Sequence, residues 1–247
     1  MTRLTPDRLG TVLGVWAHPD DEAYLSAGLM ALARDAGQRV VCVTATRGEQ
    51  GTDHPVRWPP DRLARRREAE LRASLAALGV GEHQFLGYAD GGCAQADAAI
   101  AVAQIAAIMA DVTPDTVVTF GPDGMTGHDD HRTVSAWTTA AHAQVVPQAH
   151  LLYATTTDAF AERWRDLHAQ LDVFADGAPP RTPQDEIVLE IVLDEPLADR
   201  KLVALRAQAS QTDGLLAALG EERYRAWWSS ETFRQPVLSP AAARANA

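Results

Sequence analysis

Residues 12–22, VLGVWAHPDDE, join an apolar run directly to a histidine, a proline and three acidic residues. A short apolar run that stops at a proline predicts a buried strand. Acids directly afterwards favour the first turn of a helix, where the helix dipole stabilises negative charge. His18, Asp20 and Asp21 therefore fall where a strand gives way to a helix. In an open parallel sheet, this place is the carboxyl edge, where ligands bind.

The spacing His18-x-x-Asp21 allows one turn of chain to aim an imidazole nitrogen and a carboxylate oxygen at the same point. Both groups are ligands for zinc and similar divalent metals. Asp20, between them, remains free for another role. Taken alone, however, the stretch is equally compatible with a solvated acidic helix start that holds an incidental histidine.

Residues 127–131, GHDDH, form a second cluster of histidines and acids, and this cluster also follows an apolar run. Two such clusters converge on one site when their strands end at the same sheet edge. His18, Asp21 and one histidine of the second cluster would then supply three nitrogen and oxygen ligands. Such a set leaves a coordination position open for water, which is typical of catalytic rather than structural zinc.

Apolar runs of strand length alternate with helical patterns over the first 155 residues. The expected strands are 12–17, 40–45, 83–88, 116–121 and 151–155, and the expected helices are 22–36, 61–78, 97–112 and 130–143. This alternation predicts an α/β fold, with a doubly wound, Rossmann-like and mostly parallel sheet that carries helices on both faces. Right-handed crossovers would place the first, second and fourth strand exits at one edge, which would form the active site. No G-x-G-x-x-G follows the first strand, so the dinucleotide-binding fingerprint is absent.

The alternation weakens after residue 155. The expected elements there are helices over 159–171, 196–219 and 221–228, and an antiparallel or edge strand over 186–193. Asp61 is expected to cap the helix over 61–78. The long polar loop over 47–60 follows the second strand, and its length and position favour a functional role. We expect residues 1–235 to form a single catalytic domain and residues 236–247 to be a disordered tail.

Composition and charge exclude several classes of protein. The net charge is −11 and no basic patch with interleaved aromatic residues occurs, so we expect no nucleic-acid partner. The two cysteines, Cys42 and Cys93, lie outside any CxxC pair and form no disulfide framework, which fits a reducing compartment. The sequence has no run of about 18 apolar residues and no signal-peptide core. These features predict a cytoplasmic protein that does not associate with membranes.

The strings AHPDDE at 17–22 and GHxDH at 127–131 together resemble the LmbE/PIG-L family of metal-dependent N-deacetylases. Weaker matches follow in the family's order: TRGE at 46–49, Arg67-x-x-Glu70, LGYADG at 86–91, and the pair Ser210-Gln211. The resemblance covers about residues 12–234. It implies a hydrolase that removes an acyl group, most simply acetyl, from an N-acylated amino sugar such as an N-acetylglucosamine derivative. Family members often assemble, so a homo-oligomer is a further expectation.

The resemblance also implies a role for each residue of the two motifs. Residues matching His18, Asp21 and His131 would hold zinc, and ferrous iron would suit the same ligands. Asp20 would act as the general base, and His128 would lie beside the carbonyl oxygen. The chemistry of these groups agrees, because a carboxylate can take a proton from water and return it to the leaving amine. A protonated imidazole can stabilise the developing oxyanion.

Further residues are expected around the reacting groups. Asp130 would orient His128 and raise the pKa of its ring, as carboxylates beside catalytic histidines do. Candidates for contact with sugar hydroxyls are Arg47, Glu49, Arg67 and Asp90. A structural ion pair explains each of these four equally well.

Two positions depart from the family pattern and leave the substrate open. Thr126 stands where an aromatic hydroxyl often precedes the Gly-His pair, and Gln208 stands where a histidine often precedes the Ser-Gln pair. One alternative is therefore an amidase that acts on a thiol conjugate or on an acylated antibiotic sugar. Another is a non-catalytic member that binds sugar without turnover. The acyl group, the aglycone and the pathway are not set by the sequence.

Overall fold

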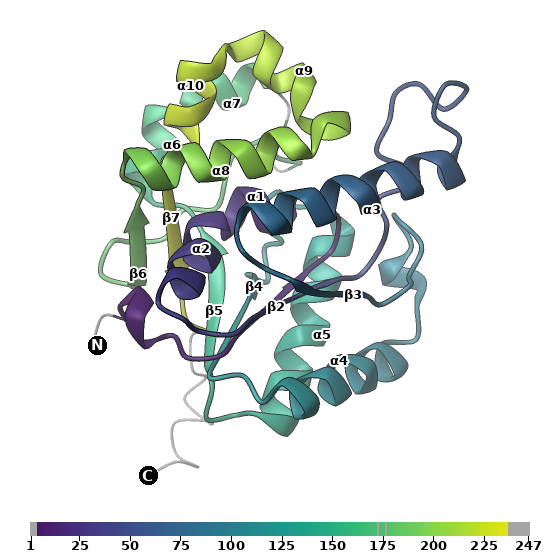
Figure 1. The fold of residues 1–247 in the computed structure, drawn as a ribbon, viewed down its shortest axis with the longest axis vertical. Helices are drawn as coiled ribbons and strands as arrows, with labels where there is room; N and C mark the ends of the chain where they lie inside the picture. The colour runs from purple at the N-terminus through teal and green to yellow at the C-terminus, as the bar shows by residue number, and fades with distance from the viewer. Residues whose placement is uncertain (1–3, 172, 176, 237–247) are drawn as a thin grey trace.

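A seven-stranded sheet in the order β3-β2-β1-β4-β5-β7-β6 runs through the molecule (Figure 1). The computed structural model describes residues 4–171, 173–175 and 177–236. The strands are β1 (Val12–Trp16), β2 (Val40–Thr44), β3 (Glu82–Phe85), β4 (Thr116–Phe120), β5 (His150–Thr155), β6 (Ile187–Val192) and β7 (Ser230–Arg234). Strands β1 to β5 are parallel, whereas β7 is antiparallel to both β5 and β6. The predicted α/β fold with a mostly parallel sheet is confirmed.

Helices cover both faces of this sheet (Figure 1). On one face α4 (Ala98–Val112) packs on α5 (Asp129–Val145), and on the other α8 (Glu195–Ala207) packs on α2 (Ala27–Asp35) and α3 (Pro60–Ala77). The remaining helices are α1 (Asp21–Leu25), α6 (Asp158–Arg163), α7 (Arg165–Leu171), α9 (Ala209–Leu219), α10 (Glu221–Trp227) and the 3₁₀ turns η1 (Pro6–Arg8) and η2 (Cys93–Gln95). Helices α6, α7, α9 and α10 gather at one end of the molecule, at the top of Figure 1.

The strand order reverses between β1 and β4. From β1 the chain winds outward through β2 to β3, and from β4 it winds the other way to β5. The connections that leave these two neighbouring strands diverge, and open α/β sheets bind ligands in the crevice that results. His18 follows β1 and the cluster at 127–131 follows β4. The topology therefore brings both sequence motifs to the reversal point, at the sheet edge where we predicted the site.

The helix predicted over 22–36 is in fact two helices, α1 and α2, which meet at Ser26. The first turn of α2 is capped from elsewhere in the chain, because Gly28 and Leu29 donate their N–H groups to the Glu231 carboxylate at 2.8 and 2.9 Å. Glu231 lies about 200 residues later, on β7. The periodicity of the local sequence gives no sign of such a distant cap, and this is why the break was missed.

Other sequence-based expectations also differ from the structure. The helix predicted over 196–219 divides at the buried Gln208 into α8 and α9. Asp61 lies inside α3 and does not cap it, because two consecutive prolines start the helix and Pro59 takes the N-cap position. The edge strand predicted over 186–193 is confirmed as β6. Strand β7 was not predicted, because its sequence SETFR contains no apolar run.

Part of the predicted domain organisation falls outside the described chain. The disordered tail was predicted for 236–247, and residues 237–247 lie beyond the described residues. The boundary at residue 235 therefore stays a prediction.

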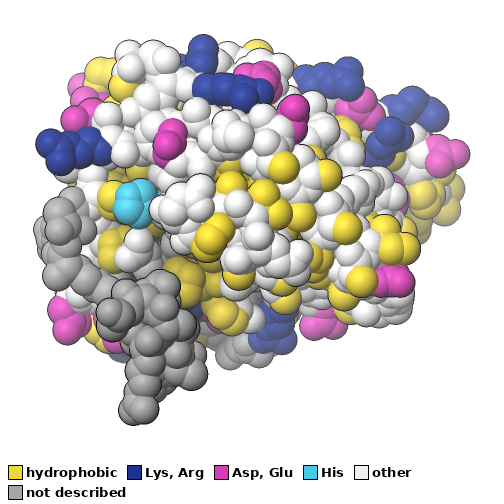
Figure 2. All heavy atoms as spheres, turned by 90° about the horizontal axis from the view of Figure 1, so that it is seen from below, with side chains coloured by type: hydrophobic (Ala, Val, Ile, Leu, Met, Phe, Trp, Pro, Cys, Tyr) yellow, Lys and Arg dark blue, Asp and Glu magenta, His cyan; other side chains and the backbone are white. Residues whose placement is uncertain are grey.

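Among the described residues, none of the helices combines the length and the apolar character that a membrane span needs. On the face shown in Figure 2, basic and acidic side chains alternate around the edge, and the centre is mostly apolar or uncharged.

A buried ion pair joins three elements behind the site. Lys201 Nζ on α8 lies 2.7 Å from Glu231 Oε1 and donates to the Tyr24 carbonyl oxygen at 2.7 Å. Both charged side chains are at most 2% exposed. Breaking such a pair is costly, because the remaining charge stays buried without compensation.

We predict that Glu231→Ala lowers the free energy of unfolding by about 3–5 kcal/mol. The variant leaves the Lys201 ammonium buried without its carboxylate partner. It also removes the acceptor for the N–H groups in the first turn of α2. Urea denaturation followed by circular dichroism measures the change. The control is Asp35→Ala, which removes an exposed ion pair with Arg200, and such pairs contribute about 0–1 kcal/mol. Equal losses in the two variants would show that the buried pair has no special role.

Candidate metal centre and active site

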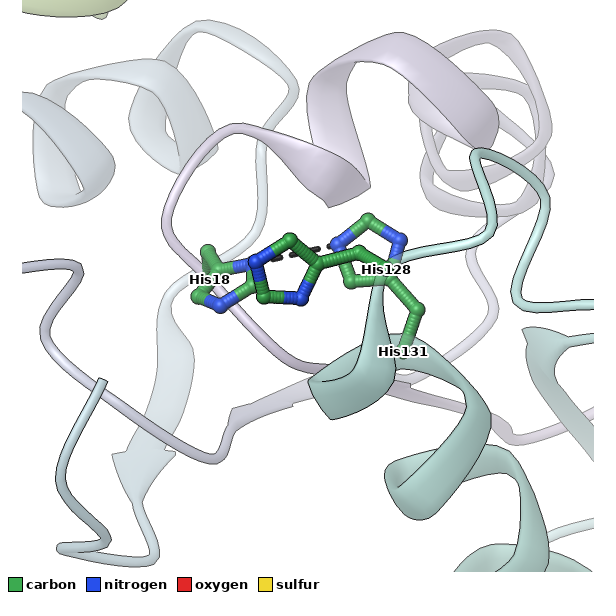
Figure 3. Close-up of side chains that lie close together, drawn as sticks. All are labelled: His18, His128 and His131. Atoms are coloured by element: carbon green, nitrogen blue, oxygen red, sulfur yellow. Dashed lines mark hydrogen bonds between the residues drawn. The ribbon is translucent and has the colours of Figure 1, made fainter. Parts of the chain in front are cut away.

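Three histidine rings gather where the β1 and β4 connections meet (Figure 3). His18 comes from the loop after β1, and His128 and His131 come from the start of α5. His18 Nδ1 lies 3.1 Å from His131 Nε2. Asp21 Oδ1 is 3.3 Å from His131 Nε2, and Asp21 Oδ2 is 3.7 Å from His18 Nδ1. The structure thus places the side chains of the three predicted metal ligands together, all of them buried.

In His18 and His131, the ring nitrogen that points towards the other histidine is the inner nitrogen, and the opposite one is the outer nitrogen. Each outer nitrogen lies beside a hydrogen-bond acceptor. His18 Nε2 lies 3.1 Å from Asp90 Oδ1 and 3.2 Å from Asp130 Oδ2, while His131 Nδ1 lies 2.9 Å from the Gly124 carbonyl oxygen. These partners assign a proton to each outer nitrogen. A neutral ring of either histidine then presents the lone pair of its inner nitrogen to the other ring and to the Asp21 carboxylate.

This arrangement favours a positive charge between the two rings. Without a metal, that charge is the proton of His18, whose Nδ1 then donates to His131 Nε2 at 3.1 Å. A divalent cation would take the place of that proton, between the two nitrogens and the Asp21 carboxylate. Burial by itself lowers the pKa of His18, but Asp130, Asp90 and Asp21 outweigh it and raise the value to about 10. Burial lowers the pKa of His131 to about 4. The donor set of two imidazoles and one carboxylate fits a divalent metal of the zinc type.

Asp130 holds His18, not His128. Its carboxylate accepts N–H groups from Gly91 at 2.7 Å and Cys93 at 3.0 Å, in addition to the contact with His18 Nε2. Burial opposes ionisation of Asp130, but these hydrogen bonds outweigh it and lower the pKa to about 2. The Asp130 carboxylate thus contacts His18 and not, as we had expected, His128, and it is the backbone N–H of Asp130 that contacts His128. Asp130 is fully buried, whereas His128 lies exposed at the helix end.

His128 is the N-cap of α5. Its Nδ1 accepts the backbone N–H of Asp130 at 3.1 Å, so a neutral His128 ring carries its proton on Nε2 and can donate a hydrogen bond from that atom. This geometry favours a neutral donor over the protonated ring that we had expected. Thr126, at the position of the family's aromatic hydroxyl, has its Oγ1 3.2 Å from His131 Nδ1.

Asp20 adopts a strained backbone at the start of α1. Its φ is 111°, in the left-handed region that residues other than glycine rarely occupy. Its N–H donates to the buried Glu22 carboxylate at 3.0 Å, and its carboxylate lies 3.3 Å from Arg67 Nη2. Burial raises the pKa of Asp20 to about 7, although Arg67 opposes the shift. Strain of this kind is concentrated at functional sites, and a carboxylate poised near neutrality suits proton transfer.

A cavity of about 440 Å³ opens over these residues. The predicted site residues that line it are His18, Asp20, Asp21, Arg67, Asp90, His128 and His131. Arg47 and Glu49 are not among its lining residues. Arg47 is exposed and lies 3.7 Å from Glu68, and Glu49 accepts the N–H of Asp90 at 3.0 Å.

Arg67 is buried and held by backbone oxygens. It donates to the Gly48 and Pro19 carbonyls at 2.8 and 2.5 Å. Its Nε is buried without a hydrogen-bond partner among the described residues. Of the four predicted contacts for a sugar hydroxyl, Arg67 and Asp90 are the two that line the cavity.

Two glutamines in the cavity wall were missed. Gln50 donates to the Asp90 carbonyl oxygen at 2.5 Å, and Gln211 donates to the Gly51 carbonyl oxygen at 3.1 Å. Each adjoins or lies within a segment that resembles the family, which was the available sequence signal. Within the polar loop over 47–60, only Gln50 and Gly51 line the cavity.

The sequence profile of the PIG-L family, described as GlcNAc-PI de-N-acetylase, matches residues 13–142. The chain belongs to this family. A relative from Acidothermus cellulolyticus, named 1D-myo-inositol 2-acetamido-2-deoxy-alpha-D-glucopyranoside deacetylase, is 36% identical over 245 aligned residues. That alignment covers 85% of this chain and 82% of the relative. The resemblance drawn from the two motifs is confirmed, and the PIG-L match includes both of them.

Solved structures confirm the fold of this PIG-L family member. The N,N'-diacetylchitobiose deacetylase of Pyrococcus horikoshii superposes with a TM-score of 0.62 at 20% identity, over 95% of this chain and 88% of that one. A zinc-inhibited teicoplanin deacetylase gives 0.68 at 16% identity, over 93% and 99%. The GalB 4-carboxy-2-hydroxymuconate hydratase of Pseudomonas putida gives 0.62 at 14% identity, over 93% and 98%. The presence of a hydratase shows that the fold alone does not determine the reaction.

Proposed function

We propose that this PIG-L family member is a zinc-dependent hydrolase that removes an acetyl or other acyl group from a small N-acylated amino sugar, such as an N-acetylglucosamine derivative. The observation that carries the proposal is the buried group His18, Asp21 and His131, with Asp20 beside it in one cavity. The name of the Acidothermus relative, which contains a 2-acetamido-2-deoxy-glucopyranoside, supports the choice of amino sugar.

The histidines and acids of the two motifs each have a role in this proposal. His18, Asp21 and His131 would hold the metal, which when bound lowers the pKa of water to about 7 and polarises the amide carbonyl. Asp20 accepts the proton of the attacking water and later delivers it to the leaving amine nitrogen. His128 donates from Nε2 to the carbonyl oxygen as negative charge develops there.

Other residues position these groups and the sugar. Asp90 and Asp130 fix the ring of His18 through its Nε2, as carboxylates beside metal-binding histidines commonly do. We assign sugar-hydroxyl contacts to Arg67, Gln50 and Asp90, which line the cavity. Glu49 acts through Asp90, whose N–H it accepts, and we assign no direct contact to Arg47.

The proposal is tested by free-amine release from a panel of N-acylated glucosamine derivatives, with and without a chelator. We expect the chelator to abolish release and one equivalent of Zn²⁺ to restore it. An N-acetylated amino acid is the control substrate and should be turned over far more slowly. Chelator-insensitive release would exclude a metal-dependent reaction. Zinc binding without release from sugars, thiol conjugates or acylated antibiotic sugars would favour a non-catalytic sugar-binding protein.

The same ligands accept ferrous iron, and affinity alone does not separate the two metals. We expect protein purified in air to contain zinc and to remain active with it. Anaerobic reconstitution with Fe²⁺ or Zn²⁺, followed by comparison of kcat, measures which metal supports the faster reaction. A kcat at least tenfold higher with Fe²⁺ would contradict the assignment of zinc as the working metal.

A further inference from the structure

One part of the cavity differs in character from the metal-binding part. It is lined by apolar side chains, which we call the apolar wall: Leu25, Met125, Val173, Phe174, Leu215 and Trp228. Leu25 lies on α1 beside the ligand Asp21, and Met125 lies in the loop that precedes the histidines of α5. The other wall residues come from the segment after α7, from α9 and from the end of α10. The wall therefore adjoins the metal centre within one continuous cavity.

The polar atoms in and beside this wall do not face the cavity as free donors. Within the wall, Trp228 Nε1 is buried and has no hydrogen-bond partner among the described residues. Trp227 and Tyr24 also line the cavity. The indole N–H of Trp227 donates to His168 Nε2 at 3.0 Å, and the hydroxyls of Tyr24 and Tyr224 lie 2.7 Å apart. Both groups are thus satisfied inside the protein. They leave mainly ring carbon to face a bound molecule.

A sugar ring alone does not account for the wall. Aromatic side chains can stack on the C–H face of a sugar, but Leu25, Met125, Val173 and Leu215 are aliphatic. A fully hydroxylated unit placed against them would lose hydrogen bonds to water without gaining others, and this opposes binding. Val173 and Leu215 are only half-buried, so a ligand in the cavity can still cover part of their surface.

The apolar wall ends at a second, smaller hollow. This hollow, of about 30 Å³, lies behind the wall and shares Tyr24, Leu25, Met125 and Trp228 with the main cavity. That space holds about one water molecule. Its remaining lining is largely hydroxyl-bearing, with Thr155, Thr156 and Thr157. The apolar surface is therefore closed at this end and suits a group of limited length.

We propose that the apolar wall binds an alkyl or aryl group that the amino-sugar substrate carries in addition to its sugar ring. This inference rests on the proposed deacylase function. The group could be attached on either side of the sugar, as the acyl chain on nitrogen or as the aglycone at the anomeric carbon. Both sources offer the wall the same chemistry, and the experiment separates them.

The test measures kcat/KM for amine release in two substrate series with the zinc-loaded full chain. One series lengthens the acyl group on glucosamine from acetyl to butyryl and hexanoyl. The other keeps N-acetyl and changes the glycoside from methyl to butyl, hexyl and phenyl. Because each buried methylene contributes about 0.8 kcal/mol, we expect about a fourfold gain per methylene in one series until the wall is filled.

A gain in either series supports the proposal and shows where the group is attached. Flat or falling values in both series, with methyl N-acetylglucosaminide still hydrolysed, would overturn the apolar-group proposal and leave the deacylase assignment intact. Absence of release from every member would instead remove the deacylase assignment, and this inference with it.

A pair of variants on α9 connects the effect to the wall. Leu215→Ala should at least halve the gain per methylene in the responsive series, because it removes apolar surface from the cavity. Leu219→Ala is the matched control, since Leu219 packs on the core from the same helix and does not line the cavity. The control should keep the full gain. An unchanged gain in Leu215→Ala would contradict the role of the wall, whatever its effect on stability.

Discussion

His18→Ala will purify without its metal and will lose kcat/KM by about 10³-fold or more, because a metal ion contributes several kcal/mol of charge stabilisation to such reactions. The substitution removes one ligand nitrogen from the group of three. It also leaves the Asp90 and Asp130 carboxylates, now 3.1 and 3.2 Å from His18 Nε2, without their shared donor. Elemental analysis after gel filtration measures the metal content of each variant. Amine release measures the loss of activity.

A graded series makes this prediction specific. Asp21→Ala and His131→Ala should behave like His18→Ala. Asp90→Asn keeps all three ligands but weakens the orientation of His18, and changes of this kind cost about 10–100-fold in metal affinity or activity. His54→Ala is the control, because His54 is an exposed histidine of the 47–60 loop that does not line the cavity. Wild-type metal content in the three ligand variants would show that the metal binds elsewhere.

Asp20→Asn should retain the metal but lower kcat by about 10²–10⁴-fold, the usual contribution of a general acid–base. The asparagine side chain has almost the same shape as aspartate, so the amide oxygen can still accept from Arg67. It cannot take a proton from water. Loss of kcat with unchanged metal content therefore separates the base from the ligands, although Asp20 and Asp21 are adjacent in the sequence.

The control for this variant is Asp129→Asn. Asp129 belongs to the second motif and lies in the first turn of α5, but it is largely exposed and does not line the cavity. It should keep kcat within about twofold of the wild type, because surface substitutions outside the site have small effects. Retention of kcat within tenfold in Asp20→Asn would remove Asp20 from the proton-transfer role.

The convergence of the three candidate ligands could be predicted because they lie in two short motifs, each directly after a strand. In a parallel sheet with a reversal in strand order, two such exits must meet. The choice of His131 over His128 came from the resemblance to the PIG-L family. The partner of Asp130 could not be predicted in the same way, because the sequence does not show towards which side of the helix end a buried first-turn carboxylate turns. Arg47 and Glu49 were candidates from the weaker match TRGE, and neither lines the cavity: Arg47 lies beside Glu68, and Glu49 accepts the N–H of Asp90.

Features that depend on residues far apart in the chain could not be predicted from local sequence patterns. The break between α1 and α2 depends on Glu231, which caps α2 from β7. Strand β7 itself is short and polar, and it becomes a strand by pairing with β5 and β6. The apolar wall draws residues from α1, α9 and α10. Their apolar side chains look like ordinary core positions until the fold places them around one cavity.

The most direct test of the metal-dependent active site is a titration of metal-free protein with Zn²⁺, followed by amine release from an N-acetylglucosamine derivative. We predict that activity rises linearly from the background level and reaches its plateau at one equivalent of zinc per chain. The same titration of His131→Ala should stay at background. Full activity of the metal-free protein, or a plateau in His131→Ala equal to that of the wild type, would contradict a reaction centred on His18, Asp21 and His131.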